Sequence, residues 1–248
     1  MLKVRLDHLL VARGDAPSRA RAQAIVLAGN VFVSGNRVDK PGTLVPEDAP
    51  LEVRVADHPY VSRGGVKLAG ALDHFAVDVH GRRCVDFGAS TGGFTDCVLQ
   101  RGAATVVAVD VGYGQLAHKL RCDARVVVME RTNARNLSPA DIGGPVDLAV
   151  VDASFIGLGK LVAALARCTR DQGELVALVK PQFEVGRREA SRGRGVVRDD
   201  KAREDAVAAA AQSVRGAGFD VLARCDSELA GPKGNREVFL HARRSGPA

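Results

Sequence analysis

Several features are scarce in this chain of 248 residues, and each scarcity argues against a class of protein. The sequence has no tryptophan and only 4% aromatic residues, so it is not typical of a protein that binds single strands by base stacking. No apolar run approaches the roughly 20 residues that a membrane-spanning helix requires. The N-terminus begins Met-Leu-Lys-Val-Arg-Leu-Asp, without the apolar core of a secretory signal. We therefore expect a cytoplasmic protein that makes no use of a membrane.

Cysteine is also sparse, and its pattern excludes two kinds of cross-link. The five cysteines form no Cys-x-x-Cys pair and are odd in number, which argues against a structural zinc site and a disulfide framework. We predict reduced thiols, as in cytosolic proteins, and no metal site. The cysteines are Cys84, Cys97, Cys122, Cys168 and Cys225.

The sequence does contain an apolar fraction of 46% and a formal net charge of +6. The apolar fraction is typical of a globular protein, and the length suits one large domain or two smaller ones. An excess of positive charge favours an anionic partner such as a nucleic acid.

Residues 1–57 have the pattern of a small α+β domain. Leu6, Leu9 and Leu10 recur at helical spacing, and Ser18 is placed to cap a second helix. Alternating apolar residues then surround a Ser-Gly-Asn turn within residues 31–38, which predicts a hairpin. Residues 58–63 interrupt both periodicities, so we predict a short linker there.

From residue 64 to residue 248 the pattern alternates between helix and strand. Such alternation predicts an α/β fold with a doubly wound, Rossmann-like and mainly parallel sheet that is covered on both faces. The last two strands follow one long helix closely, which suggests a seven-stranded sheet with one antiparallel member. The predicted strands are 84–87, 105–109, 125–129, 146–151, 175–179, 219–223 and 237–241.

A glycine-rich turn follows the first of these strands. Its spacing, acidic-x-Gly-x-x-x-Gly-Gly, is neither the Gly-x-Gly-x-x-Gly of dinucleotide-binding folds nor a P-loop. The carboxylate of Asp86 would repel a pyrophosphate but suits the cationic methionine end of S-adenosylmethionine (SAM). The residues predicted to hold SAM in this turn are Asp86, Gly88, Ser90, Thr91, Gly92 and Gly93.

Three further residues are candidates for the rest of the cofactor. Asp110 ends the next strand, 24 residues after Asp86, where a carboxylate can bond both ribose hydroxyls. Glu130 and Asn133 follow the third strand and could contact the adenine. The alternative is that Asp110 caps a strand end and that the other two are ordinary surface residues.

Four charged residues lie where ligands bind in open parallel sheets. Asp152 and Lys180 each follow an apolar strand, and ligands bind at that carboxyl edge. A lysine there is costly unless it is paired or functional. Glu237 opens the final strand, and Lys67 lies in the helix before the first strand. Each alone has an ordinary explanation, but together they predict a catalytic group of two lysines and two carboxylates.

The N-terminal layout resembles the small RNA-binding module of ribosomal protein S-four. The resemblance lies in the segments Arg5-Leu6-Asp7, Ser18-Arg19 and 31–35 (Val-Phe-Val-Ser-Gly). It implies that Arg19 and Arg21, with Arg5 and Arg13 nearby, contact RNA phosphates. The alternative is a solvated helix face, because residues 1–57 hold eight Lys and Arg against seven Asp and Glu.

The whole chain resembles the TlyA family, historically labelled haemolysins, whose catalytic part is similar to FtsJ-type ribose 2′-O-methyltransferases. The matching segments are 62–68, 86–96, 152–156, 178–184 and 234–237. The resemblance implies that the family's Lys-Asp-Lys-Glu tetrad corresponds to Lys67, Asp152, Lys180 and Glu237. It also implies SAM-dependent methylation of cytidine ribose in ribosomal RNA, free or within a ribosomal subunit.

The reaction leaves two roles open for Lys180. A ribose hydroxyl is too weak an acid to attack unaided, so its proton must leave as the new bond forms. Either a neutral Lys180 takes the proton, or a charged Lys180 stabilises the oxyanion while a carboxylate or water accepts it. We expect positioning of the hydroxyl in line with the methyl group to contribute more than either role.

A segment rich in arginine and glycine follows Lys180, between residues 185 and 198. We expect a basic flap that clamps RNA phosphate, and the alternative is an ordinary surface loop. Its candidate RNA-binding residues are Arg187, Arg188, Arg192 and Arg194.

Two other functions are alternatives to the methyltransferase. A membrane-lytic protein, as the old family label suggests, would need a long apolar or strongly amphipathic segment, and none is present. A non-catalytic RNA-binding factor of ribosome assembly is opposed by the intact tetrad and cofactor turn. The sequence leaves open the target nucleotide, the oligomeric state, and whether the substrate is naked RNA or an assembled subunit. The short chain ends favour large-subunit RNA.

Overall fold

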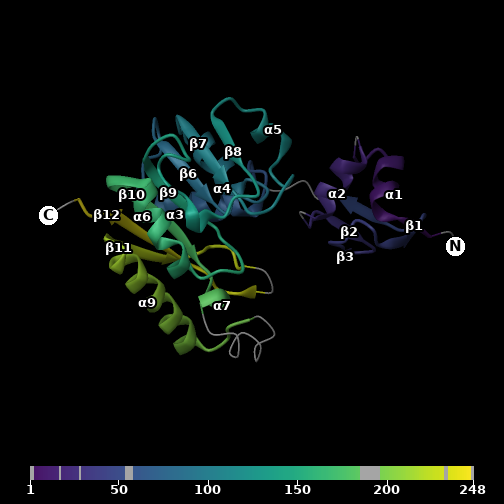
Figure 1. Cartoon of the computed structure of the whole chain (residues 1–248). Helices are drawn as coiled ribbons and strands as arrows, with labels where there is room; N and C mark the ends of the chain where they lie inside the picture. Colours follow the sequence, from purple (N-terminus) through teal and green to yellow (C-terminus); the bar gives the residue numbers. More distant parts are fainter. Residues whose placement is uncertain are drawn as a thin grey trace. The chain divides into compact units, whose positions relative to one another are not determined.

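The chain, as a computed structural model, falls into two compact units, which we call unit 1 (Met1–Pro59) and unit 2 (Tyr60–Ala248) (Figure 1). Residues 60–63, which the sequence assigns to a linker, belong to unit 2 in this division. The structure describes residues 3–16, 18–27, 29–53, 58–184, 196–231 and 234–246.

Unit 1 is a small α+β domain with two antiparallel sheets. Its elements are β1 (Lys3–Arg5), α1 (Leu6–Ala12), α2 (Arg19–Leu27), β2 (Val31–Val33), β3 (Asn36–Arg37), β4 (Leu44–Pro46) and β5 (Leu51–Val53). One sheet pairs β1 with β4, and the other has the order β3-β2-β5. In the β2–β3 hairpin, Ser34 and Gly35 have φ of 48° and 79°, the left-handed pair that a type I′ turn requires.

Unit 2 is built on one seven-stranded sheet. Its strands are β6 (Arg83–Phe87), β7 (Thr105–Val109), β8 (Val126–Met129), β9 (Val146–Val151), β10 (Thr169–Val179), β11 (Phe219–Asp226) and β12 (Val238–Arg244). The sheet order is β11-β12-β10-β9-β6-β7-β8, and β12 is antiparallel to both of its neighbours while the other pairs are parallel. The predicted α/β class, with one antiparallel strand, is confirmed.

Helices cover both faces of this sheet. The helices that the structure describes in unit 2 are α3 (Arg63–His74), α4 (Gly93–Gln100), α5 (His118–Arg121), α6 (Val162–Cys168), α7 (Pro181–Glu184) and α9 (Asp200–Gly216), with short 3-10 turns η1 (Ala134–Asn136) and η2 (Leu158–Lys160). Neighbouring residues of a strand point to opposite faces. Accordingly Cys84 packs in the core formed with α3 and α4, and Val85 packs in the core formed with α6 and α9.

Strands β10, β11 and β12 are longer than the sequence predicts, and β10 differs most. We expected a strand from Leu175, whereas β10 begins at Thr169 and its pairing with β9 shifts register between Thr169 and Glu174. The added residues are mostly polar and Gln172 has a φ of 61°, so they lack the apolar alternation that marks a regular strand. The carboxyl end of the strand lies at Val179, directly before Lys180, as predicted.

Candidate active site

The turn between β6 and α4 packs its backbone closely against two other elements. Gly88 and Gly92 have φ of 90° and 96°, which favour glycine. A Cβ on Gly88 would lie 3.0 Å from Ala153 Cα, and one on Gly93 would lie 2.2 Å from Ser62 Oγ. The glycines therefore let the turn lie against the end of β9 and the start of α3.

Thr91 and Gly92 join this turn to the segment before α5. The backbone N–H of Ala117 donates to Thr91 O at 3.1 Å. A Cβ on Gly92 would lie 2.2 Å from Leu120 Cδ1, so any side chain there would force that leucine to move. This part of the turn therefore packs against α5 and the segment before it.

Asp86, near the end of β6, is fully buried and only half satisfied. Its Oδ2 accepts hydrogen bonds from Thr95 N at 2.9 Å and from Thr95 Oγ1 at 2.7 Å. Its Oδ1 has no hydrogen-bond partner among the described residues. Burial raises the pKa of Asp86 to about 7; the bonds from Thr95 oppose the shift, whereas the charges of Asp152 and Asp110 add to it.

A cationic ligand is what this carboxylate needs. A buried ionised group is costly unless an opposite charge or a hydrogen bond compensates it. The ammonium at the methionine end of SAM would supply both to Asp86. The residues of the turn therefore fit this cofactor.

Asp110 connects the cofactor turn with the loop after β7. Its Oδ2 accepts from Ser90 N at 2.8 Å, and its Oδ1 accepts from Gly112 N at 2.6 Å. The structure thus brings Ser90 and Asp110 together. The next residue, Val111, is 71% exposed and offers an apolar surface to a flat ring, which the sequence did not single out.

Glu130 and Asn133 make different contacts. Glu130 Oε1 accepts from Gly114 N at 2.9 Å and pairs with Arg121. The bond from Gly114, together with Arg121, lowers the pKa of Glu130. Asn133 Oδ1 instead caps η1 by accepting from Arg135 N at 3.2 Å, so its carbonyl oxygen has a structural role.

The four predicted catalytic residues form two ion pairs. Lys67 Nζ, on α3, lies 2.6 Å from Glu237 Oε2, directly before β12. Lys180 Nζ, directly after β10, lies 2.6 Å from Asp152 Oδ1, directly after β9. Because β9 and β10 are parallel neighbours, their carboxyl ends meet at one edge of the sheet.

The Lys180 ammonium has further partners at this edge. It donates to Ser154 Oγ at 2.8 Å and, more weakly, to the backbone oxygen of Asp152 at 3.4 Å. Both lysine side chains are only 10% exposed. Loss of one partner of such a pair leaves the other charge poorly compensated, so each lysine depends on its carboxylate.

Asp152 lies between the cofactor turn and α3. A Cβ on Gly64 would be 3.6 Å from Asp152 Oδ2, and one on Gly88 would be 3.1 Å from its backbone oxygen. Gly64 and Lys67 are about one helical turn apart on α3. The same helix therefore carries Lys67 and borders Asp152.

Glu237 occupies a space that a glycine leaves open. A Cβ on Gly231 would lie 2.2 Å from Glu237 Oε1. That oxygen has no hydrogen-bond partner among the described residues, and the side chain is fully buried. Gly231 N bonds Asn235 O at 2.8 Å, which holds the turn in this shape.

Phe155 is an exposed aromatic residue near the site to which the sequence pattern assigned no role. Its side chain is 91% exposed, its φ is 65°, and its ring lies 5.3 Å from that of Phe183. A bulky residue in the left-handed region is a genuine outlier. The sequence shows that an aromatic residue stands three residues after Asp152, but nothing in its pattern indicates this backbone strain.

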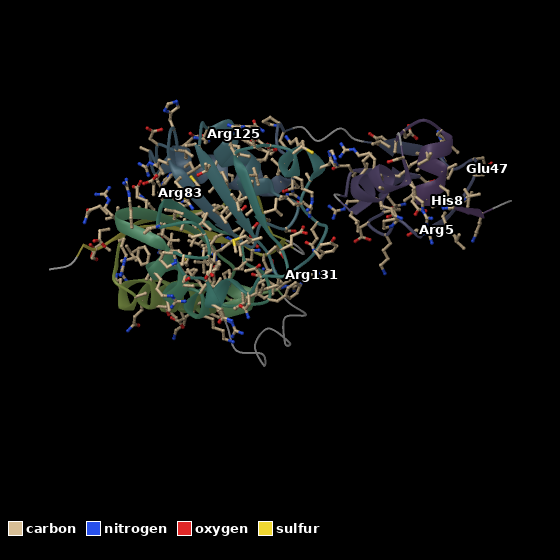
Figure 2. All side chains as sticks on the ribbon, turned by 45° about the horizontal axis from the view of Figure 1, so that its top comes forward. Arg5, His8, Glu47, Arg83, Arg125 and Arg131 are labelled. Carbon is tan, nitrogen blue, oxygen red and sulfur yellow. The ribbon has the colours of Figure 1, made fainter. Side chains whose placement is uncertain are left out.

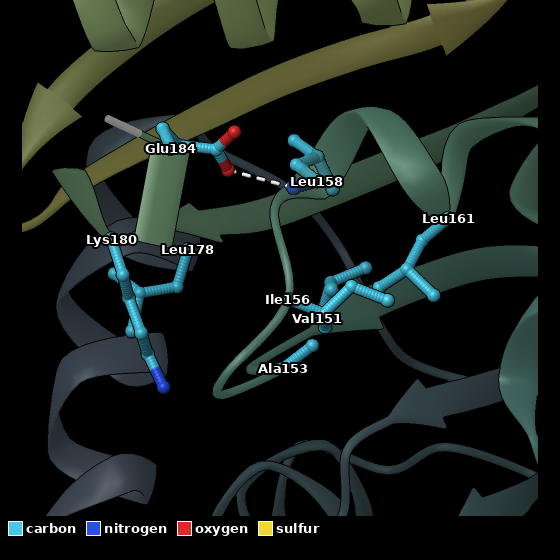
Figure 3. Close-up of a pocket in the computed structure, with 8 residues that line it drawn as sticks. All are labelled: Val151, Ala153, Ile156, Leu158, Leu161, Leu178, Lys180 and Glu184. Atoms are coloured by element: carbon cyan, nitrogen blue, oxygen red, sulfur yellow. Dashed lines mark hydrogen bonds between the residues drawn. The ribbon is translucent and has the colours of Figure 1, made fainter. Parts of the chain in front are cut away.

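A small pocket lies beside Lys180, between the ends of β9 and β10 (Figure 3). Glu184 Oε1, on α7, accepts from Leu158 N at 2.7 Å, and burial raises the pKa of Glu184. The Lys180 side chain extends away from Glu184 in this view. Glu184 therefore supports the loop before η2 rather than the lysine.

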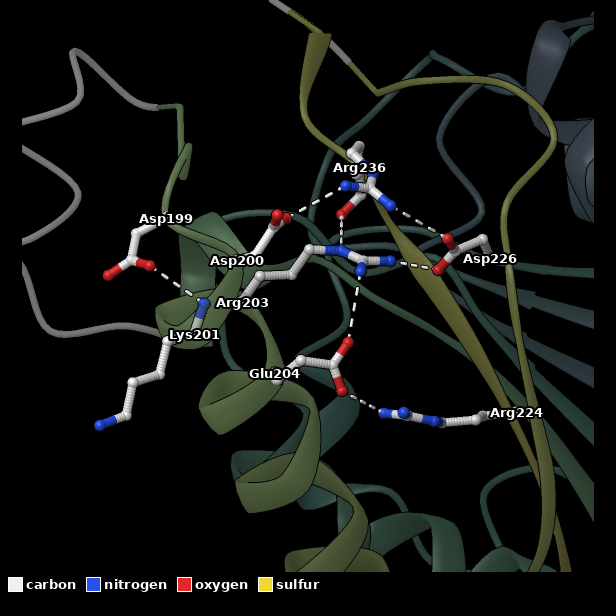
Figure 4. A network of polar contacts seen from close by, with 8 residues as sticks. All are labelled: Asp199, Asp200, Lys201, Arg203, Glu204, Arg224, Asp226 and Arg236. Carbon is white, nitrogen blue, oxygen red and sulfur yellow. Dashed lines mark hydrogen bonds and ion pairs between the residues drawn. The ribbon is translucent and has the colours of Figure 1, made fainter.

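A buried arginine fixes the segment that leads to Glu237 (Figure 4). The Arg203 side chain, on α9, is 8% exposed and pairs with Asp226 and with Glu204. Its Nε also donates to Arg236 O at 3.4 Å, the residue before Glu237. No sequence pattern points to this arginine, because it lies in a helix of ordinary pattern.

The predicted RNA-binding arginines fall into two groups. In unit 1, Arg5 and Arg19 both contact Asp7, Arg13 donates to Ala49 O at 3.1 Å, and Arg21 has an exposed side chain on α2. The others, Arg187, Arg188, Arg192 and Arg194, lie outside the described residues.

The described part of the chain contains no cluster of three or more His, Cys, Asp or Glu side chains that could hold a metal ion. No helix among these residues is long and apolar enough to cross a membrane.

Known proteins similar to this chain share both of its parts. Residues 60–244 match the family FtsJ-like methyltransferase, and residues 4–50 match the S4 domain. A Mycobacterium tuberculosis protein named 16S/23S rRNA (cytidine-2'-O)-methyltransferase TlyA is 50% identical over 242 residues, which cover 97% of this chain and 90% of that protein. A Brachyspira hyodysenteriae protein named Hemolysin A is 40% identical, over 96% of this chain and 99% of that one.

Solved structures agree with this similarity. A Streptococcus thermophilus protein described as a hemolysin is 41% identical and has a TM-score of 0.77, over 99% of this chain and 90% of that chain. A SAM-dependent methyltransferase from Listeria monocytogenes has a TM-score of 0.56 at 13% identity, over 73% of this chain and 98% of that chain. The second likeness supports the fold alone.

Proposed function

The chain belongs to the TlyA family of FtsJ-like methyltransferases, and on that basis we propose that it methylates the ribose 2′ hydroxyl of a cytidine in ribosomal RNA. SAM is the methyl donor in this proposal. The observation that carries it is the pair of buried lysine–carboxylate contacts, Lys67–Glu237 and Lys180–Asp152, on elements that border the cofactor turn. The name of the M. tuberculosis relative supports the substrate.

The cofactor would be held along the edge of the sheet by residues from three strands. Asp86 would pair with its methionine end and Asp110 would bond its ribose hydroxyls, while Val111 and Glu130 would border its adenine. SAM supplies an activated methyl group on a sulfonium leaving group. The side chains of this chain would position the ribose hydroxyl, stabilise its developing charge and accept its proton.

In the proposed reaction Lys180 remains charged. The ribose oxygen forms a bond to the methyl carbon, the bond from that carbon to sulfur breaks, and the hydroxyl proton is lost. The 2.6 Å contact with Asp152 stabilises the ammonium of Lys180, so a neutral lysine would first have to give up this pair. Lys180 then stabilises the developing oxyanion, and Asp152 accepts the proton.

Phe155 is suited to receive the base of the target nucleotide. Its exposed ring would stack on a flat base, a contact that contributes roughly 1–3 kcal/mol. A strained backbone of this kind persists where function maintains it. Supported by Phe183, Phe155 would hold a base so that its ribose reaches Lys180.

Transfer of labelled methyl from SAM to purified ribosomal subunits and their free RNAs tests the proposal. We expect label in RNA that survives alkali, because a methylated 2′ oxygen cannot attack the neighbouring phosphate. Lys180→Ala should lose about 10²–10³-fold in rate. Lys160→Ala, which removes an exposed lysine of η2, serves as the matched control and should transfer normally.

Two results would point to other functions. Binding to subunits without transfer to any of these RNAs would indicate an RNA-binding factor of ribosome assembly. Release of haemoglobin from red cells by the purified protein would support a membrane-lytic role, which the name of the B. hyodysenteriae relative suggests.

A further inference from the structure

Unit 1 contains a carboxylate that is more deeply buried than its sequence position suggests. Asp7 lies in the first turn of α1, with no exposed surface, next to the core residue Leu6. Burial of an ionised carboxylate is unfavourable unless cations and hydrogen bonds compensate it. The contacts of Asp7 supply both kinds of compensation.

Three side chains donate to this one carboxylate. Arg5 donates from Nε to Oδ1 at 2.9 Å and from a terminal nitrogen to Oδ2 at 3.0 Å. Arg19 donates from Nε to Oδ2 at 3.0 Å, and Gln23 donates to the same oxygen at 2.9 Å. The Arg5 guanidinium and these other donors hold the pKa of Asp7 well below its usual range.

The two arginines remain accessible although their shared partner is buried. Their side chains are 42% and 55% exposed, against 0% for Asp7. Arg19 uses only its Nε on Asp7, and its two terminal nitrogens have no partner among the described residues. Two guanidinium groups that would repel one another are thus kept close together, with donors still available to solvent.

We propose that Asp7 is a positioning residue that presents Arg5 and Arg19 together as a preorganised site for an RNA phosphate. The inference rests on the proposed function, because it assumes that unit 1 binds ribosomal RNA. A free arginine side chain loses considerable rotamer freedom when it binds, and a side chain already fixed loses less. Guanidinium forks also match the geometry of phosphate oxygens.

This role predicts an effect opposite in sign to simple charge attraction. Asp7→Asn removes one negative charge from unit 1, so a purely electrostatic account predicts tighter RNA binding. If Asp7 positions the arginines, the same substitution weakens binding. The sign of the change therefore separates the two accounts.

The experiment measures binding of full-length protein to labelled ribosomal RNA transcripts across a range of salt concentrations. For Asp7→Asn we expect about tenfold weaker binding, since a charge-assisted contact is lost. We also expect a shallower salt dependence, because about one fewer phosphate contact is made. Equal or tighter binding by Asp7→Asn would overturn the inference.

A matched control is Glu47→Gln, which removes a charge of the same sign from unit 1. Glu47 is exposed and lies apart from Arg5 (Figure 2), and no ion pair is found for it in the described part of the chain. This variant should bind RNA as tightly as the wild type or slightly tighter. Weakening equal to that of Asp7→Asn would also contradict the role of Asp7.

Charge-conserving substitutions keep the test decisive if Asp7→Asn unfolds unit 1. Arg5→Lys and Arg19→Lys keep the charge but lose the planar fork, so each should weaken binding about fivefold or more. Arg37→Lys, on the exposed strand β3, should leave it unchanged. Equal binding by all three variants would show that the arrangement around Asp7 is irrelevant to RNA.

Failure of this inference and failure of the proposed function give different results. If the wild type binds no ribosomal RNA and transfers no methyl group, the proposed function fails. If the wild type does both and Asp7→Asn does both equally well, only the positioning role fails. SAM affinity should be the same in both proteins, because the cofactor residues lie in unit 2.

Discussion

Asp7 in unit 1 and Asp86 in unit 2 are both fully buried, yet their pKa values move in opposite directions. The Arg5 guanidinium lowers the pKa of Asp7, whereas burial raises that of Asp86 to about 7, because only the neutral donors of Thr95 contact it. Burial alone therefore does not decide the charge of a carboxylate; its cationic partner does. Asp7 already has its cations, and Asp86 lacks one until a cationic ligand binds.

The largest effect expected from this difference concerns the stability of unit 2. A folded pKa of about 7 for Asp86 lies above the unfolded value of about 3.9, so stability falls as pH rises through that window. By linkage the loss amounts to about 4 kcal/mol at most. Urea unfolding without SAM, monitored by hydrogen exchange of β6 amides, should show this loss of stability in the wild type. The substitution Asp86→Asn should remove the pH dependence. Equal pH profiles for both proteins would mean that Asp86 keeps an ordinary pKa.

The next largest effect concerns SAM affinity. Asp86→Asn should weaken SAM binding about 30-fold at pH 7.5, because the ligand loses a charged hydrogen-bond partner. In the wild type the affinity should increase as pH rises from 5.5 towards about 7, as Asp86 ionises. Titration calorimetry measures both, with Asp205→Asn on the exposed face of α9 as the control. Unchanged affinity in Asp86→Asn would place the methionine end elsewhere.

A smaller effect of opposite sign is expected in unit 1. Because the folded pKa of Asp7 is depressed, its stabilising contribution is present above the unfolded value and is lost as pH falls towards the folded one. Hydrogen exchange of α1 should therefore show a loss of about 1–2 kcal/mol between pH 5 and pH 3 that is reduced in Asp7→Asn. The same acid loss in both proteins would show that other carboxylates dominate.

The smallest effect is expected at Glu184, a carboxylate without the cationic partners of Asp7 and outside the cofactor turn that holds Asp86. Burial raises its pKa, and its one described bond is from Leu158 N. Glu184→Gln preserves an acceptor for that bond, so the rate of methyl transfer should change by less than about threefold. A loss of 100-fold or more would instead give its carboxylate a part in the chemistry.

The sequence predicts that Asp152 and Lys180 meet at one edge of the sheet, because topology determines their positions, while their catalytic role stays a prediction. Glycines collect where the backbone must turn after β6, and Asp152 and Lys180 follow neighbouring parallel strands, so their meeting follows from the strand order. Glu237 precedes β12, and its partner Lys67 lies in a helix, where a lysine is usually exposed, so the pattern alone does not pair the two. The two ion pairs themselves are a result of the structure.

Other features depend on tertiary contacts that no pattern encodes. Asp7 follows Leu6 at an ordinary helix start, and nothing local shows that two arginines from different elements converge on it. The left-handed backbone of Phe155 and the capping role of Asn133 also arise from neighbouring segments. Sequence reasoning finds residue types at the ends of elements, but it does not find which side chains share a partner.

In the proposed mechanism a charged Lys180 stabilises the ribose oxygen during methyl transfer. Single-turnover transfer to ribosomal subunits by Lys180→Arg and Lys180→Ala tests it most directly, because arginine keeps the charge but cannot act as a base. We predict alkali-resistant label from Lys180→Arg at a reduced rate, at least about tenfold above that of Lys180→Ala. Equal loss in both variants would contradict a charged role, and full transfer by Lys180→Ala would remove this lysine from the mechanism.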